Sequence, residues 1–282
     1  MLVDLHCHSL CSDGQLSPKD LVIRAHEKGV THLALTDHDT LNGLPEAQQT
    51  AREQGIQLIS GIEFSTVWNG MGIHVVGLNF DPQHPTMKSA VAEQEACRLE
   101  RAKAIAQRLE KQGIQGVWEE AQEVANGAQI GRPHFAQALI NLGKVNNMAS
   151  AFKRYLGAGK AGDVKTHWPE LAKAVDWIVQ AGGVAVLAHP DKYKLTRTKL
   201  KYLLRAFKDA GGNAVEVTTG GMDASFAQRM AEYCDEYDFV GSQGSDFHGP
   251  RPWSELGKFT PMPKSVTPVW HDWSIDSQTV AV

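Results

Sequence analysis

Near its start the sequence reads Asp4-Leu5-His6-Cys7-His8-Ser9-Leu10-Cys11-Ser12-Asp13, and the organisation of the chain can be worked out from this stretch. Side chains two apart in an extended strand point to the same face, so His6 and His8 face one side together. Asp13 follows on the loop beyond the predicted strand. Two imidazoles and a carboxylate from so short a segment are typical of one wall of a metal site. A buried strand with incidental histidines is the alternative, and the recurrence of matching residues along the chain disfavours it.

Apolar segments that end in polar residues alternate with helical segments over much of the chain. Further strands are predicted at residues 32–39, 57–64, 73–80, 184–188, 214–218 and 239–241. Repeated strand–helix units indicate a parallel sheet. Seven strands that deliver polar residues near their carboxyl ends fit a closed or distorted barrel better than an open sheet, and no Gly-x-Gly-x-x-Gly follows the first strand. We therefore predict an α/β fold, a distorted TIM-like (β/α)7 barrel.

Residues 85–168 break this rhythm, because their pattern is helical and contains no convincing strand. Helices are predicted there at residues 86–111, 117–125, 132–142 and 148–156. We expect residues 1–84 to form the first part of the barrel and residues 85–168 to form a helical insertion that covers the active site. Residues 169–282 should supply the second part of the barrel and a C-terminal tail, whose position the sequence does not predict.

The composition is that of a soluble globular protein, with 42% hydrophobic and 21% charged residues in 282. No apolar run approaches the ~20 residues that a membrane helix needs, and the first residues lack the pattern of a secretory signal. The 4 cysteines are scattered, and a chain of this length does not need disulfides. A reducing, cytoplasmic location is therefore expected, with a monomer as the default.

Charge is distributed unevenly along the chain. The net charge of −4 argues against a general nucleic-acid clamp, so we expect no stable binding of duplex nucleic acid. Residues 98–165 nevertheless contain 11 Lys and Arg against 6 Asp and Glu. Two explanations of this excess are equally good: solvated helix faces, or anion contacts made by the insertion. The acidic remainder holds the candidate ligands, where bound divalent cations would reverse the local sign.

Histidines and carboxylates gather at the predicted strand ends. The candidates are His6, His8, Asp13, Asp37, His38, Glu63, His74, His189, Asp246 and His248. Burying so many ionisable groups without a metal would cost on the order of several kcal/mol each. The set is too large for one tetrahedral ion, so two or three divalent metals are implied, and His with carboxylate but no Cys suits Zn, Mn or Fe. Cys7 should point away from the two histidines beside it, into the barrel packing.

The ordered motifs are Asp4-Leu-His6-Cys-His8-Ser, Thr36-Asp-His38-Asp, Gly61-Ile-Glu63, His74-Val-Val-Gly-Leu, Ala188-His189-Pro190 and Gly244-Ser-Asp246-Phe-His248. Together they resemble the PHP family, the polymerase and histidinol phosphatase superfamily. The insertion, with Gly131-Arg132-Pro-His134-Phe and Lys153-Arg-Tyr-Leu-x-x-Gly159-Lys160, is similar to its TrpH-like, or RNase AM-like, branch. Members of that branch are metal-dependent nucleotide phosphoesterases. The resemblance implies release of the 3′-phosphate from nucleoside 3′,5′-bisphosphates, 5′→3′ trimming of short RNA, or both, by a metal-activated water.

The resemblance also implies a trinuclear site, with Mn as the first expectation and Zn or Fe as alternatives. In that scheme one metal is held by His6, His8 and Asp246, and Glu63 bridges it to a second metal on His74 and His189. A third metal is held by Asp13, His38 and His248. Asp37 is expected to orient an imidazole from outside the ligand set.

Catalytic and substrate-binding roles are expected for a smaller group. Asp246 could accept the proton of the attacking water, Arg132 could neutralise phosphoryl oxygens, and His134 could protonate the leaving alcohol. Arg132 and His134 lie near a predicted helix start, which favours an anion. Lys160 and Lys192 are further candidate phosphate contacts, although relatives often carry Arg at the second of these, and Lys offers only a point charge. Trp68 and Phe247 could stack a nucleobase, with core packing as the alternative.

Two other functions remain as alternatives. A histidinol-phosphate phosphatase would use the same metal ligands on a smaller substrate, but a small monoester does not require a basic insertion. A non-catalytic regulatory module would be expected to have lost ligands, and this sequence retains every position of the pattern.

Overall fold

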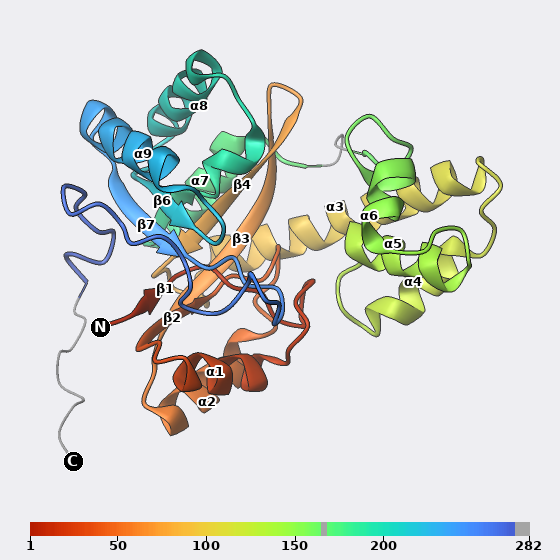
Figure 1. Cartoon of the computed structure of the whole chain (residues 1–282), viewed down its shortest axis with the longest axis horizontal. Helices are drawn as coiled ribbons and strands as arrows, with labels where there is room; N and C mark the ends of the chain where they lie inside the picture. The colour runs from red at the N-terminus through yellow and green to blue at the C-terminus, as the bar shows by residue number, and fades with distance from the viewer. Residues whose placement is uncertain (165–167, 274–282) are drawn as a thin grey trace.

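The computed structural model describes residues 1–164 and 168–273, and their centre is a seven-stranded sheet with the strand order β1-β2-β3-β4-β5-β6-β7. The strands are β1 (Val3–Asp4), β2 (His32–Leu35), β3 (Gln57–Trp68), β4 (Met71–Leu78), β5 (Val184–Leu187), β6 (Ala214–Thr219) and β7 (Val240–Gly244). The first and last strands meet, because the Leu5 amide donates to the Gln243 carbonyl at 3.1 Å and the His8 amide to that of Phe247 at 2.9 Å. The sheet is thus a nearly closed barrel, and the predicted fold class is confirmed (Figure 1).

The fourth strand corrects the expectation of repeated strand–helix units. No helix separates β3 from β4; the two-residue turn Asn69-Gly70 joins them, with φ of 48° and 72°. Two consecutive positive φ angles are typical of a tight hairpin turn that ends in glycine. β4 therefore runs antiparallel to both β3 and β5. Its amino-terminal half, with His74, lies at the edge where the parallel strands end.

The first strand is shorter than the sequence suggests, since only Val3 and Asp4 pair with β2. The backbone beyond it stays extended, and Cys7 forms an isolated bridge with Phe247. Cys7 is fully buried and its thiol donates to the Ala34 carbonyl at 3.2 Å, away from the two histidines that flank it. The expected alternation across this segment is present without a long strand.

Helices cover the outside of the barrel. They are α1 (Pro18–Glu27), α2 (Leu44–Gln54), α7 (Leu171–Gln180), α8 (Arg197–Asp209) and α9 (Ala224–Tyr237). The predicted start of α1 is present, because the Ser17 hydroxyl accepts from the Asp20 amide at 3.0 Å and Pro18 occupies the first turn. α1 and α2 lie together on one side, and α7, α8 and α9 lie on the other (Figure 1).

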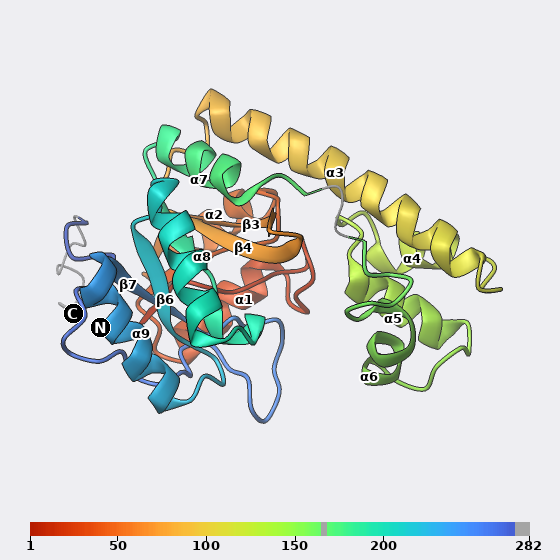
Figure 2. The same cartoon turned by 90° about the horizontal axis from the view of Figure 1, so that it is seen from above.

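The segment between β4 and α7 is helical, as predicted. It contains α3 (Pro85–Glu110), α4 (Val117–Ala125), α5 (Arg132–Asn141), α6 (Met148–Ala151) and a π-helical turn, η1 (Phe152–Leu156). The first turns of α3 pack Met87 and Ala90 into the barrel core, whereas Ile105 and Leu109 pack with Leu139 and its neighbours in a separate core. We call the unit built from the second half of α3, α4, α5, α6 and η1 the helical lobe (Figure 2).

Because α3 belongs to both cores, the boundary near residue 85 stays a prediction. Residues 165–167 of the predicted insertion lie outside the described residues. So do residues 274–282 of the predicted tail. The earlier part of the tail packs on the barrel, where Val269 donates to the Gly241 carbonyl and Gly241 donates to that of Thr267, both at 2.8 Å.

Candidate metal centre

Nine of the predicted metal-site residues meet at one edge of the barrel. Just past β2, the backbone of His38 forms an isolated parallel β-bridge with that of Glu63. His74 comes from the antiparallel strand β4. The complete set is His6, His8, Asp13, His38, Glu63, His74, His189, Asp246 and His248. The closing contacts between the ends of the chain bring the first and last of these together, although more than 200 positions separate them in the sequence.

Glu63 lies at the centre of the group, with 1% of its surface exposed. Its Oε2 atom is 3.2 Å from Nε2 of His6, 3.2 Å from Nε2 of His8 and 3.1 Å from Nδ1 of His38. Its Oε1 atom is 2.9 Å from Nδ1 of His74 and 2.9 Å from Nε2 of His189. One buried carboxylate thus faces five imidazoles. No packing requirement explains such an arrangement.

Two further carboxylates complete the group. Asp13 Oδ1 lies 3.3 Å from Nε2 of His248, and Asp13 Oδ2 lies 3.8 Å from Nε2 of His38. Asp246 Oδ1 lies 3.5 Å from Nε2 of His6 and 3.4 Å from Nε2 of His8. The nine residues therefore form a continuous cluster of nitrogen and oxygen donors.

Several buried donor atoms in this cluster make no hydrogen bond, although other atoms of the cluster lie close to them. Among the described residues these are His8 Nδ1, Asp13 Oδ1, His38 Nδ1, Glu63 Oε2 and His189 Nδ1. Nε2 of His6 and Nε2 of His8 also approach each other to 3.1 Å. Buried polar atoms are nearly always satisfied, so orphaned atoms around a shared centre point to a missing partner. Four overlapping sets of donors within 4.8 Å of one another fit divalent cations.

The ionisation of the carboxylates follows from the surrounding imidazoles. Burial alone would raise the pKa of the Glu63 carboxyl, but His38, His6 and His74 outweigh it and hold that pKa well below its usual range. For Asp13, burial is likewise outweighed by the nearby His248 and His38, so its pKa is also well below the usual value. Both groups are anions at neutral pH, which is the form that binds a metal.

The histidines separate into two kinds. Burial lowers the pKa of His38, His74 and His248, leaving neutral rings with a free lone pair. His6 behaves differently, because the carboxylates of Glu216 and Glu63 outweigh its burial and raise its pKa to about 10. A metal at His6 would have to displace a proton, so metal binding there should release protons.

Two residues outside the ligand set differ from the sequence-based interpretation. Asp37 was expected to orient an imidazole, which is wrong: its carboxylate accepts from the Ser9 amide, the Ser9 hydroxyl and the Ser12 hydroxyl at 2.6–2.7 Å. It thereby fixes the loop that carries Asp13. Glu216, which the sequence analysis missed, lies 2.6 Å from Nδ1 of His6. The available signal was a single glutamate within a strand of otherwise uncharged residues. All six residues of that strand are buried, and a buried carboxylate needs a partner.

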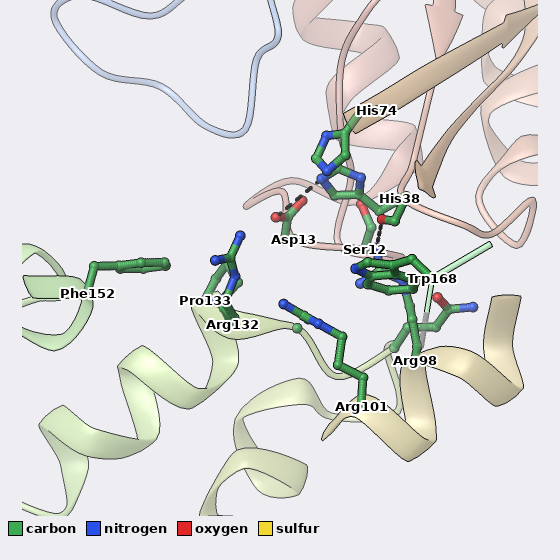
Figure 3. A pocket seen from close by; sticks show the side chains of 13 residues that line it. Ser12, Asp13, His38, His74, Arg98, Arg101, Arg132, Pro133, Phe152 and Trp168 are labelled. Carbon is green, nitrogen blue, oxygen red and sulfur yellow. Dashed lines mark hydrogen bonds and ion pairs between the residues drawn. The ribbon is translucent and has the colours of Figure 1, made fainter. Parts of the chain in front are cut away.

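A pocket lined by arginines lies between the metal cluster and the helical lobe. Arg98 and Arg101 of α3 and Arg132 of α5 line it together with Asp13, His38 and His74 of the barrel (Figure 3). An adjoining pocket shares Arg101 and Arg132 and continues over the cluster. Arg98 and Arg101 are one turn apart on α3, a spacing that could have been read from the sequence. Arg98 pairs with Asp39 at 2.6 Å, whereas Arg101 donates to the Val164 carbonyl at 2.6 Å.

The other predicted substrate residues occupy different surroundings. His134 caps its own helix, since its Nδ1 accepts from the Gly131 amide at 2.9 Å, and it does not line either pocket among the described residues. Lys160 is exposed in the loop after η1 and also lines neither. Lys192 lines the pocket over the cluster, where its Nζ contacts Asp246.

The aromatic residues at the site are not those suggested from the sequence. Phe247 is fully buried in the core beneath α1, and Trp68 packs against the barrel core. Phe152 of η1 and Trp168 line the arginine pocket instead (Figure 3). The guanidinium groups of Arg98 and Arg101 lie 5.3 and 5.1 Å from the Trp168 ring, so that ring is already covered by cations.

The PHP domain family matches residues 4–220, a range that ends just after β6. It includes eight of the ten strand-end candidates named above. The chain belongs to the PHP domain family. It is 47% identical over 267 residues to a 5′-3′ exoribonuclease of Haemophilus influenzae, covering 95% of this chain and 97% of the relative. It is 38% identical over 272 residues to a 3′,5′-nucleoside bisphosphate phosphatase of Chromobacterium violaceum, covering 96% and 95%.

A solved structure of an amidohydrolase from Chromobacterium violaceum, with bound sulfate and no metal, has the same fold. It superimposes with a TM-score of 0.89 at 38% identity, covering 96% of this chain and 95% of that one. For residues 1–164 and 168–273 we also find that no helix combines the length and apolar character required to cross a bilayer.

Proposed function

We propose that this PHP-family protein is a metal-dependent phosphoesterase that hydrolyses nucleoside 3′,5′-bisphosphates, trims short RNA from its 5′ end, or does both. The observation that carries the proposal is the combination of a nine-residue donor cluster with an adjoining arginine pocket. Relatives of nearly the same length are named for these two activities. Both substrate classes contain a nucleotide with phosphate on each side of the ribose, so one site can serve both.

We propose three metals, with Mn²⁺ first, arranged as the resemblance implies. His6, His8 and Asp246 form one compact donor set, and Asp13, His38 and His248 lie together in a second. Glu63 contacts both His74 and His189 at 2.9 Å, which supports a bridging role toward the remaining position. When bound, such cations would supply hydroxide at neutral pH and offset phosphoryl charge.

The side chains around the cluster have distinct tasks in this proposal. Arg132 and Arg101 face the cluster from the lobe and would hold phosphoryl oxygens through charge-assisted hydrogen bonds. Burial lowers the pKa of Arg101 to about 9, helped by the neighbouring Arg132 and Arg98. An anion entering here would relieve this repulsion. Phe152 gives the arginine pocket, which Arg101 and Arg132 also line, an apolar face that a nucleobase could cover.

Lys192 and Asp246 are paired in the structure, and we propose that they separate in the working enzyme. Asp246 would accept the proton of the attacking water, and Lys192 would turn toward the phosphate. His134 and Lys160 keep their predicted roles only if substrate reaches beyond the two pockets.

The cytoplasmic location and the monomeric state both remain predictions. Light scattering on the purified protein tests the oligomeric state.

The experiment compares kcat/KM with Mn²⁺ for adenosine 3′,5′-bisphosphate, 5′-AMP, histidinol phosphate and a 5′-phosphorylated RNA pentamer. Preference for the bisphosphate, with shortening of the RNA from its 5′ end, is expected. Glu63→Gln is the matched inactive control and excludes a contaminating phosphatase. Preference for histidinol phosphate would overturn the substrate class, and no turnover by metal-loaded protein would overturn the phosphoesterase assignment.

A further inference from the structure

Glu216 occupies an unusual place for a charged residue. It lies in β6, in which every residue is buried, and only 1% of its surface is exposed. A carboxylate in such a position destabilises the fold unless each oxygen has a partner. Glu216 has one for each. Its Oε1 lies 2.6 Å from Nδ1 of His6, and its Oε2 accepts from the backbone amide of His189.

The contact with His6 fixes which ring nitrogen is available. A carboxylate oxygen can only accept, so Nδ1 of His6 must donate, and its lone pair is not free for a metal. Nε2 of the same ring points into the donor cluster, 3.2 Å from Glu63 Oε2 and 3.5 Å from Asp246 Oδ1. A carboxylate behind a ligating histidine orients the ring and strengthens its donor nitrogen.

The contact with His189 acts through the backbone. His189 has φ 28° and ψ 61°, a conformation that is costly for a residue with a side chain. Its amide is held by Glu216, and from there its Nε2 reaches Glu63 at 2.9 Å. One carboxylate therefore fixes the direction of two imidazoles that contact different oxygens of Glu63.

We infer that Glu216 is a positioning residue for the metal centre, setting the tautomer of His6 and the backbone of His189 so that both rings present Nε2 to the cluster. The inference rests on the proposed function in one respect, the assignment of these histidines as ligands. It adds a residue that lies outside the nine ligands, on a strand that carries none of the family motifs described above.

Glu216→Gln tests this because glutamine keeps the shape but has only one acceptor oxygen. It can satisfy His6 or His189, not both, and its NH2 group then faces the other donor. Mn²⁺ and Zn²⁺ affinity is measured by chelator competition, and metal content by elemental analysis. We expect at least one metal equivalent to bind about 10–100-fold more weakly, as found for contacts behind metal ligands. Unchanged affinity would overturn the inference.

Thr218→Val is the matched control. Thr218 is on the same strand and fully buried, and its hydroxyl has no hydrogen-bond partner among the described residues. The metal affinity of the Thr218→Val variant should equal that of the wild type. A lower melting temperature of metal-free Glu216→Gln with wild-type metal affinity would show a purely structural role and overturn the inference. Glu216→Asp keeps the charge and serves if the glutamine variant does not fold, with a smaller loss expected.

A double-mutant cycle identifies the route of the effect. If Glu216 acts through His6, the loss of affinity in Glu216→Gln with His6→Ala should be far less than additive, whereas with His248→Ala it should be additive. Nitrogen-15 NMR of Zn²⁺-loaded wild type should show His6 protonated at Nδ1. A His6 ring protonated at Nε2 would overturn the inference. Wild type that binds no metal at all would instead refute the proposed function.

Discussion

At the scale of single residues, the site depends on one carboxylate among many imidazoles. Glu63 faces five histidine rings within 3.2 Å, and three of them share its Oε2 atom. This is why burial does not protonate it, and each of the three proposed ligand sets contains a histidine that contacts it. An exposed glutamate would gain little from any one of these contacts.

Glu63→Gln should abolish turnover, because the amide removes the negative charge and leaves only one weak acceptor for cations. Metal affinity should fall by at least the ~100-fold that contacts behind a ligand can cost. Metal content and kcat/KM are measured together. Glu236→Gln, which removes an exposed carboxylate paired with Lys201 at 2.7 Å, is the control and should change neither. Activity that survives in Glu63→Gln would refute the ligand assignment.

Arg132→Ala should act on substrate binding and leave metal loading intact. Its guanidinium lines both pockets, and a hydrogen bond to a charged group contributes about 1.5–3 kcal/mol, or roughly 10–150-fold in kcat/KM. The loss should be larger for adenosine 3′,5′-bisphosphate than for 5′-AMP. Arg154→Ala is the control, because Arg154 is an exposed arginine of the same lobe that contacts the Lys144 carbonyl. Reduced metal content in Arg132→Ala would mean that its role was misassigned.

At the scale of elements, the lobe is fastened to the metal-binding loop by a buried network. Arg98 of α3 donates to Asp39, the residue after His38, and Asp39 also accepts from the Ser65 amide at 2.7 Å. Gln94, one turn earlier on α3, donates to the Ser65 carbonyl at 2.8 Å. The arginine pocket is therefore held at a fixed position over the cluster. A rigid support of this kind is what a substrate site needs.

Breaking this network should cost stability. Arg98→Ala leaves Asp39 buried and uncompensated, for which about 3–5 kcal/mol of unfolding free energy is expected. Lys103→Ala on the same helix breaks only an exposed pair with Glu100 and should cost about 0–1 kcal/mol. Urea unfolding measures both. The double variant Arg98→Met/Asp39→Asn should recover part of the loss. Equal costs for the two alanine variants would contradict the proposed fastening.

At the scale of the whole molecule, the metals should join the two ends of the chain. The ligands come from residue 6 through residue 248, so bound cations stabilise the closed barrel and not the unfolded chain. Linkage predicts about 4 kcal/mol of added stability when free metal exceeds Kd by 1,000-fold. Removal of metal by a chelator should lower the melting temperature by several degrees, and Mn²⁺ should restore it. An unchanged melting temperature would argue against a metal centre.

The metal-free protein should lose stability in acid. His38, His74 and His248 have lowered pKa values when folded, so the unfolded chain binds more protons as the pH falls below about 6.5, and unfolding becomes easier. His6 acts oppositely, since its stabilising contribution is fully present below about pH 6.5 and is lost as the pH rises from there toward about 10. Thermal melts of chelated protein between pH 5 and 8 test the acid limb. Equal melting temperatures at pH 5 and pH 8 would contradict the predicted loss of stability in acid.

The sequence by itself determined the fold class, the helical interruption and the residue types of the centre. These follow from short-range pattern: alternation around His6 and His8, apolar segments that end in polar residues, and motifs of fixed spacing. Only the tertiary structure decided what depends on contacts between distant segments. The tertiary structure made β4 antiparallel to its neighbours and directed the Asp37 carboxylate to the loop serines. It also buried Phe247 and brought Arg101 and Glu216 to the site. Spacing along the chain carries no record of such pairings, because barrel closure and helix packing create them.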